Sequence, residues 1–148
     1  MFHLTVYRKG YNWRHATQQA SIEVLEEQEN MFSAWISLTY VNEEGVLAIW
    51  QPAEVEELIE YWIKRRDFEE RLNLVVRMGP ESVEMQANKR EVGVELQGTV
   101  KPDNLEAVRQ TLIEFFTFLL MELKQPTLTI NYSFQGVTQP TLKLVNKN

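Results

Sequence analysis

The chain has no cysteine and only two histidines, His3 and His15, among its 148 residues. The absence of cysteine excludes disulfides, thiolate nucleophiles and the common cysteine-based zinc sites. Neither histidine has another histidine or a carboxylate four residues away, the spacing that places two metal ligands on one side of a helix. We therefore expect no metal ion and no cofactor.

The six glycines form none of the motifs that hold phosphates or present a nucleophilic serine. A Gly-x-x-x-x-Gly-Lys loop, a Gly-x-Gly-x-x-Gly loop and a Gly-x-Ser-x-Gly turn are all absent from the sequence. With His3 and His15 as the only histidine bases, no serine is singled out as a nucleophile. The sequence thus contains no nucleotide-binding loop and no recognisable hydrolase centre.

The chain also lacks a basic excess and a long apolar run. Its 21 acidic and 15 basic residues give a net charge of −6, which repels phosphate backbones, so we expect no nucleic-acid partner. The most apolar segment, residues 112 to 123, contains Glu114 and Glu122 and is shorter than the ~20 residues that cross a bilayer. The N-terminus lacks the basic start and unbroken apolar run of a secretory signal. We therefore expect a cytoplasmic protein that does not bind membranes.

Two segments have the periodicity of amphipathic helices. Apolar residues recur at helical spacing from Val55 to Ile63, which predicts a helix over residues 52 to 66 with Pro52 in its first turn. A second helix begins near Pro102 and ends before Pro126, because a residue that precedes proline is disfavoured in helical geometry. Its apolar residues extend almost around the helix, so we expect neighbouring elements to cover it on more than one side.

Segments rich in β-branched and aromatic residues precede and follow these helices and predict strands. Turns are expected at residues 42 to 45, where Glu43 and Glu44 are expected to be solvated, at Gly79-Pro80 and at residues 88 to 90. After the second helix, TLTINYSF (residues 127 to 134) alternates between polar and apolar residues, which predicts a strand with one solvent-exposed face. The pattern predicts one α+β domain over residues 1 to 148, in which a mainly antiparallel sheet packs against two long helices.

The two predicted helices open in a similar way, with QPAEVEELIEYWI at residues 51 to 63 and KPDNLEAVRQTLI at residues 101 to 113. Strands precede each of them. We interpret this as a βββα-type internal duplication, with half-repeats at about residues 20 to 66 and 72 to 123, followed by closing strands at residues 127 to 145.

Candidate site residues fall into two groups. The segment KGYNWRHAT, residues 9 to 17, has no periodicity and mixes aromatic with basic side chains in an expected loop, which favours a contact surface formed by Tyr11, Trp13, Arg14 and His15. The outward side of the first helix carries Glu54, Glu57 and Glu60, which would attract a basic partner.

Other prominent side chains favour a structural interpretation. Trp35, Trp50 and Trp62 fall at positions that predict packing in the core. Glu114 lies in an apolar helix and raises the alternative of a catalytic acid, but an exposed stripe on that helix explains it more simply. We therefore predict no catalytic residue.

The order of strand, acidic amphipathic helix, strands and second helix over residues 34 to 120 resembles small bacterial immunity proteins that neutralise polymorphic or contact-dependent toxins. The segments QPAEVEELIEYWI, LNLVVRMGPESVEMQANKREVGVELQ and NLEAVRQTLIEFF carry this resemblance. It implies a cytosolic, non-catalytic inhibitor that blocks one cognate toxin, often a basic nuclease, through an acidic surface. No functional residue is carried over, because the pattern has no invariant site.

Three functional hypotheses follow. The first is a non-catalytic cytosolic protein-binding domain, an immunity or inhibitor protein for a toxin, and not an enzyme. The alternative is a small-molecule-binding or enzymatic α+β domain with a pocket that aromatic residues line between sheet and helices. The third is a phage or secretion assembly protein or chaperone, in which the apolar second helix joins two copies as a homodimer.

Overall fold

The computed structural model describes residues 2–5, 19–25, 29–67, 73–86, 89–102 and 104–148. Its described helices are α2 (Pro52–Lys64) and α4 (Leu105–Glu122). Its described strands are β1 (Phe2–Thr5), β2 (Gln19–Ile22), β3 (Asn30–Ser37), β4 (Thr39–Val41), β5 (Leu47–Ile49), β6 (Leu74–Gln86), β7 (Lys89–Val100), β8 (Thr127–Phe134), β9 (Val137–Thr138) and β10 (Leu142–Val145).

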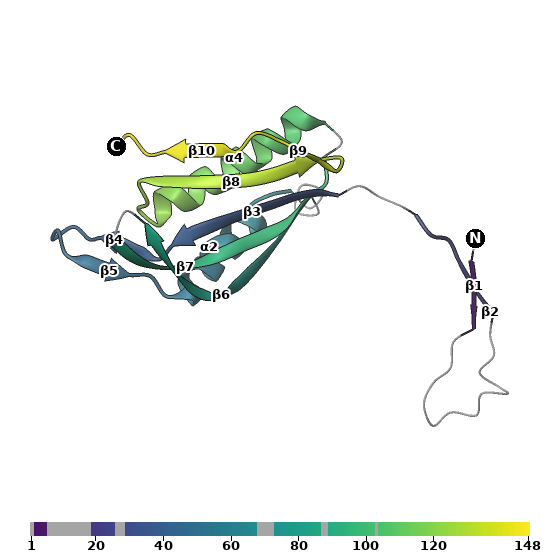
Figure 1. The fold of residues 1–148 in the computed structure, drawn as a ribbon, viewed down its shortest axis with the longest axis horizontal. Coiled ribbons are helices and arrows are strands. Elements are labelled where there is room, and N and C mark those ends of the chain that lie inside the picture. Colours follow the sequence, from purple (N-terminus) through teal and green to yellow (C-terminus); the bar gives the residue numbers. More distant parts are fainter. Residues whose placement is uncertain (1, 6–18, 26–28, 68–72, 87–88, 103) are drawn as a thin grey trace, which may run out of the picture.

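An antiparallel sheet forms the centre of the molecule, with strands in the order β10-β8-β3-β7-β6 and β9 paired to β8. Helices α2 and α4 lie behind this sheet in the view of Figure 1, so both cover the same face. The prediction of an α+β fold with a mainly antiparallel sheet and two helices is therefore confirmed. The hairpins β1–β2 and β4–β5 form separate two-stranded sheets, and β1–β2 lies apart from the main body in Figure 1.

The core forms where the apolar sides of strands and helices meet. In β8, Leu128, Ile130 and Tyr132 are buried while Thr127 and Thr129 are exposed, which is the alternation that the sequence predicts. Helix α4 has six buried apolar side chains, namely Val108, Leu112, Phe115, Phe116, Leu119 and Leu120. These six side chains therefore pack in the core of the same chain.

One predicted turn is wrong. Gly79 and Pro80 lie inside the continuous strand β6, where the pairing register with β7 shifts between Met78 and Glu81. Such a shift is a β-bulge. A bulge in an edge strand such as β6 is a position where a sheet tolerates proline, which has no N–H group to donate to a neighbouring strand. A bulge and a turn use the same residue types, so the sequence pattern alone does not distinguish them.

Trp35 also differs from its predicted place in the core. Its neighbours in β3, Ala34 and Ile36, are buried on the helix side, so Trp35 points to the uncovered face of the sheet. There its ring lies against Gly93 of β7 and its Nε1 donates a hydrogen bond of 2.8 Å to Ser82 Oγ. Trp50 and Trp62 pack against the core as predicted.

The internal duplication stays a prediction, as do the single domain over residues 1 to 148 and the bounds of its half-repeats. Helix α2 follows β3, β4 and β5, whereas α4 follows the long hairpin β6–β7. No helix in the described part of the chain combines the length and apolar character needed to cross a membrane.

Candidate functional site

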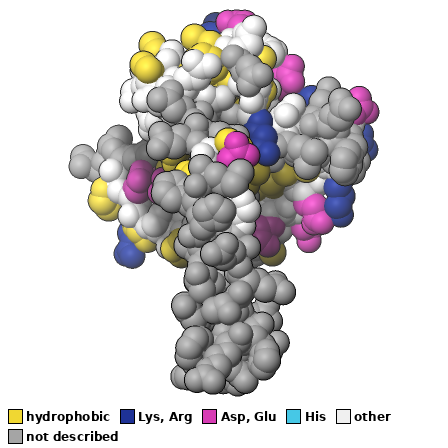
Figure 2. All heavy atoms as spheres, turned by 90° about the vertical axis from the view of Figure 1, so that its right-hand side faces the viewer, with side chains coloured by type: hydrophobic (Ala, Val, Ile, Leu, Met, Phe, Trp, Pro, Cys, Tyr) yellow, Lys and Arg dark blue, Asp and Glu magenta, His cyan; other side chains and the backbone are white. Residues whose placement is uncertain are grey.

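The two predicted contact surfaces have different outcomes. Tyr11, Trp13, Arg14 and His15 lie outside the described residues. On the face that Figure 2 shows, Lys and Arg side chains lie among Asp and Glu side chains, so the net negative charge does not gather into one acidic patch there.

The acidic residues of α2 are exposed, but two of them have local structural partners. Glu54 completes a capping box, in which its Oε1 accepts a hydrogen bond of 3.1 Å from the backbone N–H of Gln51. Glu60 pairs with Lys64 at 2.7 Å, and this hydrogen bond and charge lower the pKa of Glu60. Glu57 is exposed, and a role of Glu54, Glu57 and Glu60 in binding a partner stays a prediction.

Glu114 is exposed on α4, as the sequence predicts, and it has two hydrogen-bond donors beside it. Its carboxylate accepts hydrogen bonds from Gln110 Nε2 at 3.1 Å and from Arg66 Nη2 at 3.2 Å. The hydrogen bond from Gln110, together with the Arg66 guanidinium, lowers the pKa of Glu114, although partial burial opposes this. A carboxylate that is ionised more readily than usual is a poor general acid near neutral pH.

The lowered pKa gives a pH-dependent stability. Because the folded-state pKa lies below the unfolded value, the contribution of Glu114 is present above the unfolded pKa and is lost as the pH falls through the folded pKa. We expect Glu114→Gln to lower the free energy of unfolding by about 0.5 kcal/mol at pH 7, since the pair is partly exposed, and to match the wild type at pH 2. Urea unfolding at both pH values measures this, with Glu57→Gln as control. A difference that persists unchanged at pH 2 would contradict the assignment.

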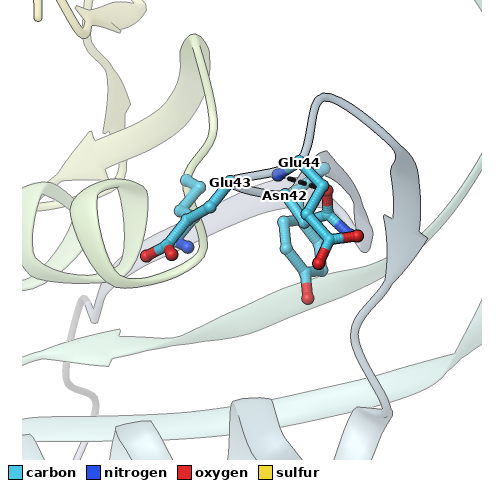
Figure 3. A pocket seen from close by; sticks show the side chains of 5 residues that line it. Asn42, Glu43 and Glu44 are labelled. Carbon is cyan, nitrogen blue, oxygen red and sulfur yellow. Dashed lines mark hydrogen bonds between the residues drawn. The ribbon is translucent and has the colours of Figure 1, made fainter.

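A polar pocket of about 270 Å³ lies beside the turn between β4 and β5. We call it the Tyr40 pocket, and its lining residues are Tyr40, Asn42, Glu43, Glu44 and Lys124. Figure 3 shows these five side chains around the pocket, with those of the β4–β5 turn labelled. Lys124 lies just after the C-cap of α4, so the pocket joins two segments that are about eighty residues apart in sequence.

The turn that carries the two carboxylates is held by Asn42. Its Oδ1 accepts hydrogen bonds of 3.0 Å from the backbone N–H groups of Glu44 and Val46, and the first of these is drawn in Figure 3. Gly45 has a φ of +77° and donates its N–H to the Asn42 carbonyl at 3.0 Å. An Asx turn closed by a left-handed glycine is a defined structure, so the backbone beneath Glu43 and Glu44 is fixed.

The aromatic wall of the pocket is fixed as well. The Tyr40 ring stacks on Trp50 with 4.2 Å between ring centroids, and Trp50 Nε1 donates a hydrogen bond of 2.9 Å to the Leu123 carbonyl. The buried Gln125 donates to the carbonyls of Thr39 at 2.8 Å and Leu123 at 3.0 Å. These bonds join β4 to the end of α4, so Tyr40 and Lys124 are held in place relative to each other.

The charges in the Tyr40 pocket are not neutralised by one another. Within the described part of the chain, neither Glu43 nor Glu44 forms an ion pair with Lys124, whose Nζ lies 5.7 Å from the centre of the Tyr40 ring. Two carboxylates, one ammonium and an aromatic ring suit a ligand that carries both positive and negative charge. The described residues contain no group of three side chains suited to holding a metal ion.

Sequence reasoning missed this pocket. It recognised residues 42 to 45 as a hairpin turn but assigned the two glutamates to solvent, and it had no reason to connect them with Lys124. The charged turn and the residue after α4 come together only once the hydrogen bonds of Gln125 and Trp50 hold the end of α4 against β4 and β5.

A second depression, the α2–β6 groove, has a volume of about 390 Å³. Its lining residues are Glu56, Ile59, Glu60, Ile63, Lys64, Val76 and Met78. The groove is largely apolar, and two of its three charged residues, Glu60 and Lys64, pair with each other. It therefore has fewer polar groups available to orient a ligand than the Tyr40 pocket has.

No family model and no curated protein match this chain. Solved structures with a similar fold are described as a phage SAM lyase in complex with S-methyl-5′-thioadenosine and a phage SAM lyase in its apo state. The first has a TM-score of 0.58 at 10% identity, and the second has a TM-score of 0.61 at 12% identity. In both cases the likeness covers 86% of this chain and 98% of the other chain. At this identity the likeness shows the fold.

These likenesses correct two predictions. The hypothesis of a non-catalytic immunity or inhibitor protein is wrong, as is the prediction that the chain is not an enzyme, because the solved proteins that share this fold are described as a lyase. They favour the alternative, a small-molecule-binding or enzymatic α+β domain. The error has a physical cause: motif searches detect sites whose residues are close in sequence, and a site assembled from distant segments leaves no such motif.

The pattern-level resemblance to immunity proteins stays a prediction of the sequence alone. A protein partner, a homodimer, and the exclusion of nucleic acid and membrane also stay predictions.

Proposed function

We propose that this chain is an enzyme that binds SAM (S-adenosylmethionine) and cleaves it as a lyase, with the Tyr40 pocket as part of the binding site. The observation that carries the proposal is the likeness to phage SAM lyase, which extends over 98% of that chain. Shared fold alone does not fix function, so the proposal also depends on the chemistry of the pocket.

The Tyr40 pocket suits the charges of SAM. SAM has a sulfonium cation, an ammonium group and a carboxylate, and the pocket offers two carboxylates, one ammonium and an aromatic ring. Carboxylates and aromatic faces attract cations, while a lysine attracts a carboxylate. At about 270 Å³ the pocket holds only part of a molecule of this size, so the rest of the ligand extends over the neighbouring surface.

The proposed reaction needs no second reactant. Formation of S-methyl-5′-thioadenosine from SAM breaks the bond between sulfur and the aminobutyryl carbon, and the sulfur keeps the electron pair. The aminobutyryl carbon then receives a pair either from the substrate's own carboxylate oxygen or from a neighbouring C–H bond whose proton a base removes. In the second case Glu43 or Glu44 is the group in the pocket that takes the proton. A cytoplasmic location belongs to this proposal, because SAM is an intracellular metabolite.

The test is to incubate the purified protein with SAM and to follow S-methyl-5′-thioadenosine by liquid chromatography. We expect the thioether to accumulate with the wild type, and to form at least tenfold more slowly with the double variant Glu43→Gln/Glu44→Gln, the effect typical of removing a catalytic proton acceptor or its charge. The matched control is Glu54→Gln/Glu57→Gln, which removes the same charge from α2.

The result that would overturn the proposal is a folded wild-type protein that forms no thioether and binds neither SAM nor S-methyl-5′-thioadenosine by calorimetry. Cleavage that the Glu43/Glu44 double variant leaves unchanged would instead place the reaction outside the Tyr40 pocket, and the α2–β6 groove would then be the next candidate.

A further inference from the structure

Lys124 occupies a backbone position that usually favours glycine. Its φ is +53°, its N–H donates to the Met121 carbonyl at 3.2 Å, and the N–H of Gln125 donates to the Leu120 carbonyl at 3.0 Å. These two bonds define a Schellman motif, in which the left-handed residue after the helix is most often glycine because a Cβ atom is unfavourable there. The chain therefore accepts backbone strain at this position while keeping a long cationic side chain.

That side chain lines the Tyr40 pocket. Lys124 is exposed and has no ion pair with Glu43 or Glu44 among the described residues, so its ammonium group is available to a ligand. The backbone beside it is fixed, because the buried Gln125 bonds to Thr39 and Leu123. The single cation of the pocket thus stands on a rigid support opposite a turn that carries two anions.

We infer that Lys124 binds the carboxylate at the amino-acid end of SAM, and that Glu43 and Glu44 accept hydrogen bonds from its ammonium group. This inference rests on the proposed function and deepens it by assigning one end of the substrate to the Tyr40 pocket. S-methyl-5′-thioadenosine lacks both of these charged groups. Lys124 consequently distinguishes substrate from product, because the product makes none of these contacts and is released more readily.

The experiment measures dissociation constants by calorimetry for two ligands. One is sinefungin, a SAM analogue that keeps the adenosine, a positive charge and the amino-acid end but has no cleavable sulfonium. The other is S-methyl-5′-thioadenosine. We expect Lys124→Gln to weaken sinefungin binding about tenfold, as loss of one charge-assisted hydrogen bond does, and to change the dissociation constant of S-methyl-5′-thioadenosine by less than about twofold. Lys124→Arg should restore most of the sinefungin affinity, since it keeps the charge.

A ligand without the carboxylate provides an independent check. Decarboxylated SAM keeps the sulfonium and the amine, so Lys124→Gln should bind it as tightly as the wild type does. The matched protein control is Lys143→Gln, which removes an exposed lysine of β10 and should leave every dissociation constant unchanged.

The outcomes separate the two proposals. If Lys124→Gln weakens both ligands equally, or weakens neither, the inference is overturned while the SAM-binding function stands. A lysine after a helix can also serve only to stabilise the helix dipole; the variant would then melt at a lower temperature without any change in the ratio of the two affinities, and that result also overturns the inference. A wild type that binds neither ligand overturns the proposed function itself.

Discussion

Replacing Phe116 with alanine is expected to lower the free energy of unfolding by about 3–5 kcal/mol, the range for truncation of a fully buried phenylalanine. Phe116 has no exposed surface. Its ring meets Phe32 of β3 edge-on at 5.6 Å and Phe115 at 4.9 Å, so it connects the helix layer to the central strand of the sheet. Interiors packed around aromatic rings close only partly over the space that truncation leaves. Urea unfolding followed by circular dichroism measures the change.

Met121→Ala is the control for this prediction. Met121 lies on the same helix, and 46% of its surface is exposed. We therefore expect a change of no more than about 0.5 kcal/mol, as for most surface substitutions. Equal effects of the two variants would mean that α4 does not pack on the sheet through the face described above.

Gly98→Ala is expected to be the most damaging single-methyl addition in the sheet. Gly98 lies in β7 between β3 and β6, and a Cβ atom there would overlap the carbonyl oxygen of Val75 and approach Phe32 Cζ to 2.8 Å. The oxygen belongs to backbone, so the strand itself must move. We expect a loss of about 3 kcal/mol or more, at the upper end of the effects of overpacking, measured by thermal or urea unfolding of the purified variant.

Gly79→Ala adds the same methyl group to the neighbouring strand β6, at a position that has room for it. Its Cβ atom would lie 3.5 Å from the Glu95 carbonyl oxygen, an ordinary van der Waals distance, and Gly79 does not have a positive φ. We expect a change below about 1 kcal/mol. If Gly98→Ala proved as mild as Gly79→Ala, the close approach of β6 to β7 at Gly98 would be disproved.

The helices were the most predictable elements of this protein. Apolar residues at helical spacing, a proline in the first turn of α2 and a proline beyond α4 are local signals that operate within one element. The start of α4 differs from its prediction because Asn104 caps the helix: its Oδ1 accepts hydrogen bonds from the N–H groups of Glu106 and Ala107. The helix therefore begins at Leu105 rather than near Pro102.

The strands were predictable in type but less so in pairing. Alternation identified β8 correctly, whereas Gly79 and Pro80 were read as a turn although they form a bulge within β6. Alternation also cannot say which of two faces the helices will cover. Trp35 illustrates this limit, because its large apolar ring suggested the core and yet lies on the uncovered face over Gly93.

The candidate site was not predictable at all from local patterns. The sequence showed a polar turn near Glu43 and, separately, a lysine after a helix. Only the hydrogen bonds of Trp50 and Gln125 to the end of α4 bring the two together and hold Tyr40 between them.

By itself the sequence determined the fold class, the two helices and the net charge. Periodicity and capping residues act within a few neighbouring residues, and composition is a sum over the whole chain, so none of them depends on which distant segments come into contact. The tertiary structure alone decided which face of the sheet is covered, where β6 bulges, and that Glu43, Glu44 and Lys124 share one pocket with Tyr40. These features depend on contacts between segments far apart in the chain. The energy of such a contact is set by how the two segments pack against each other, and not by the residues adjacent to each segment in the sequence.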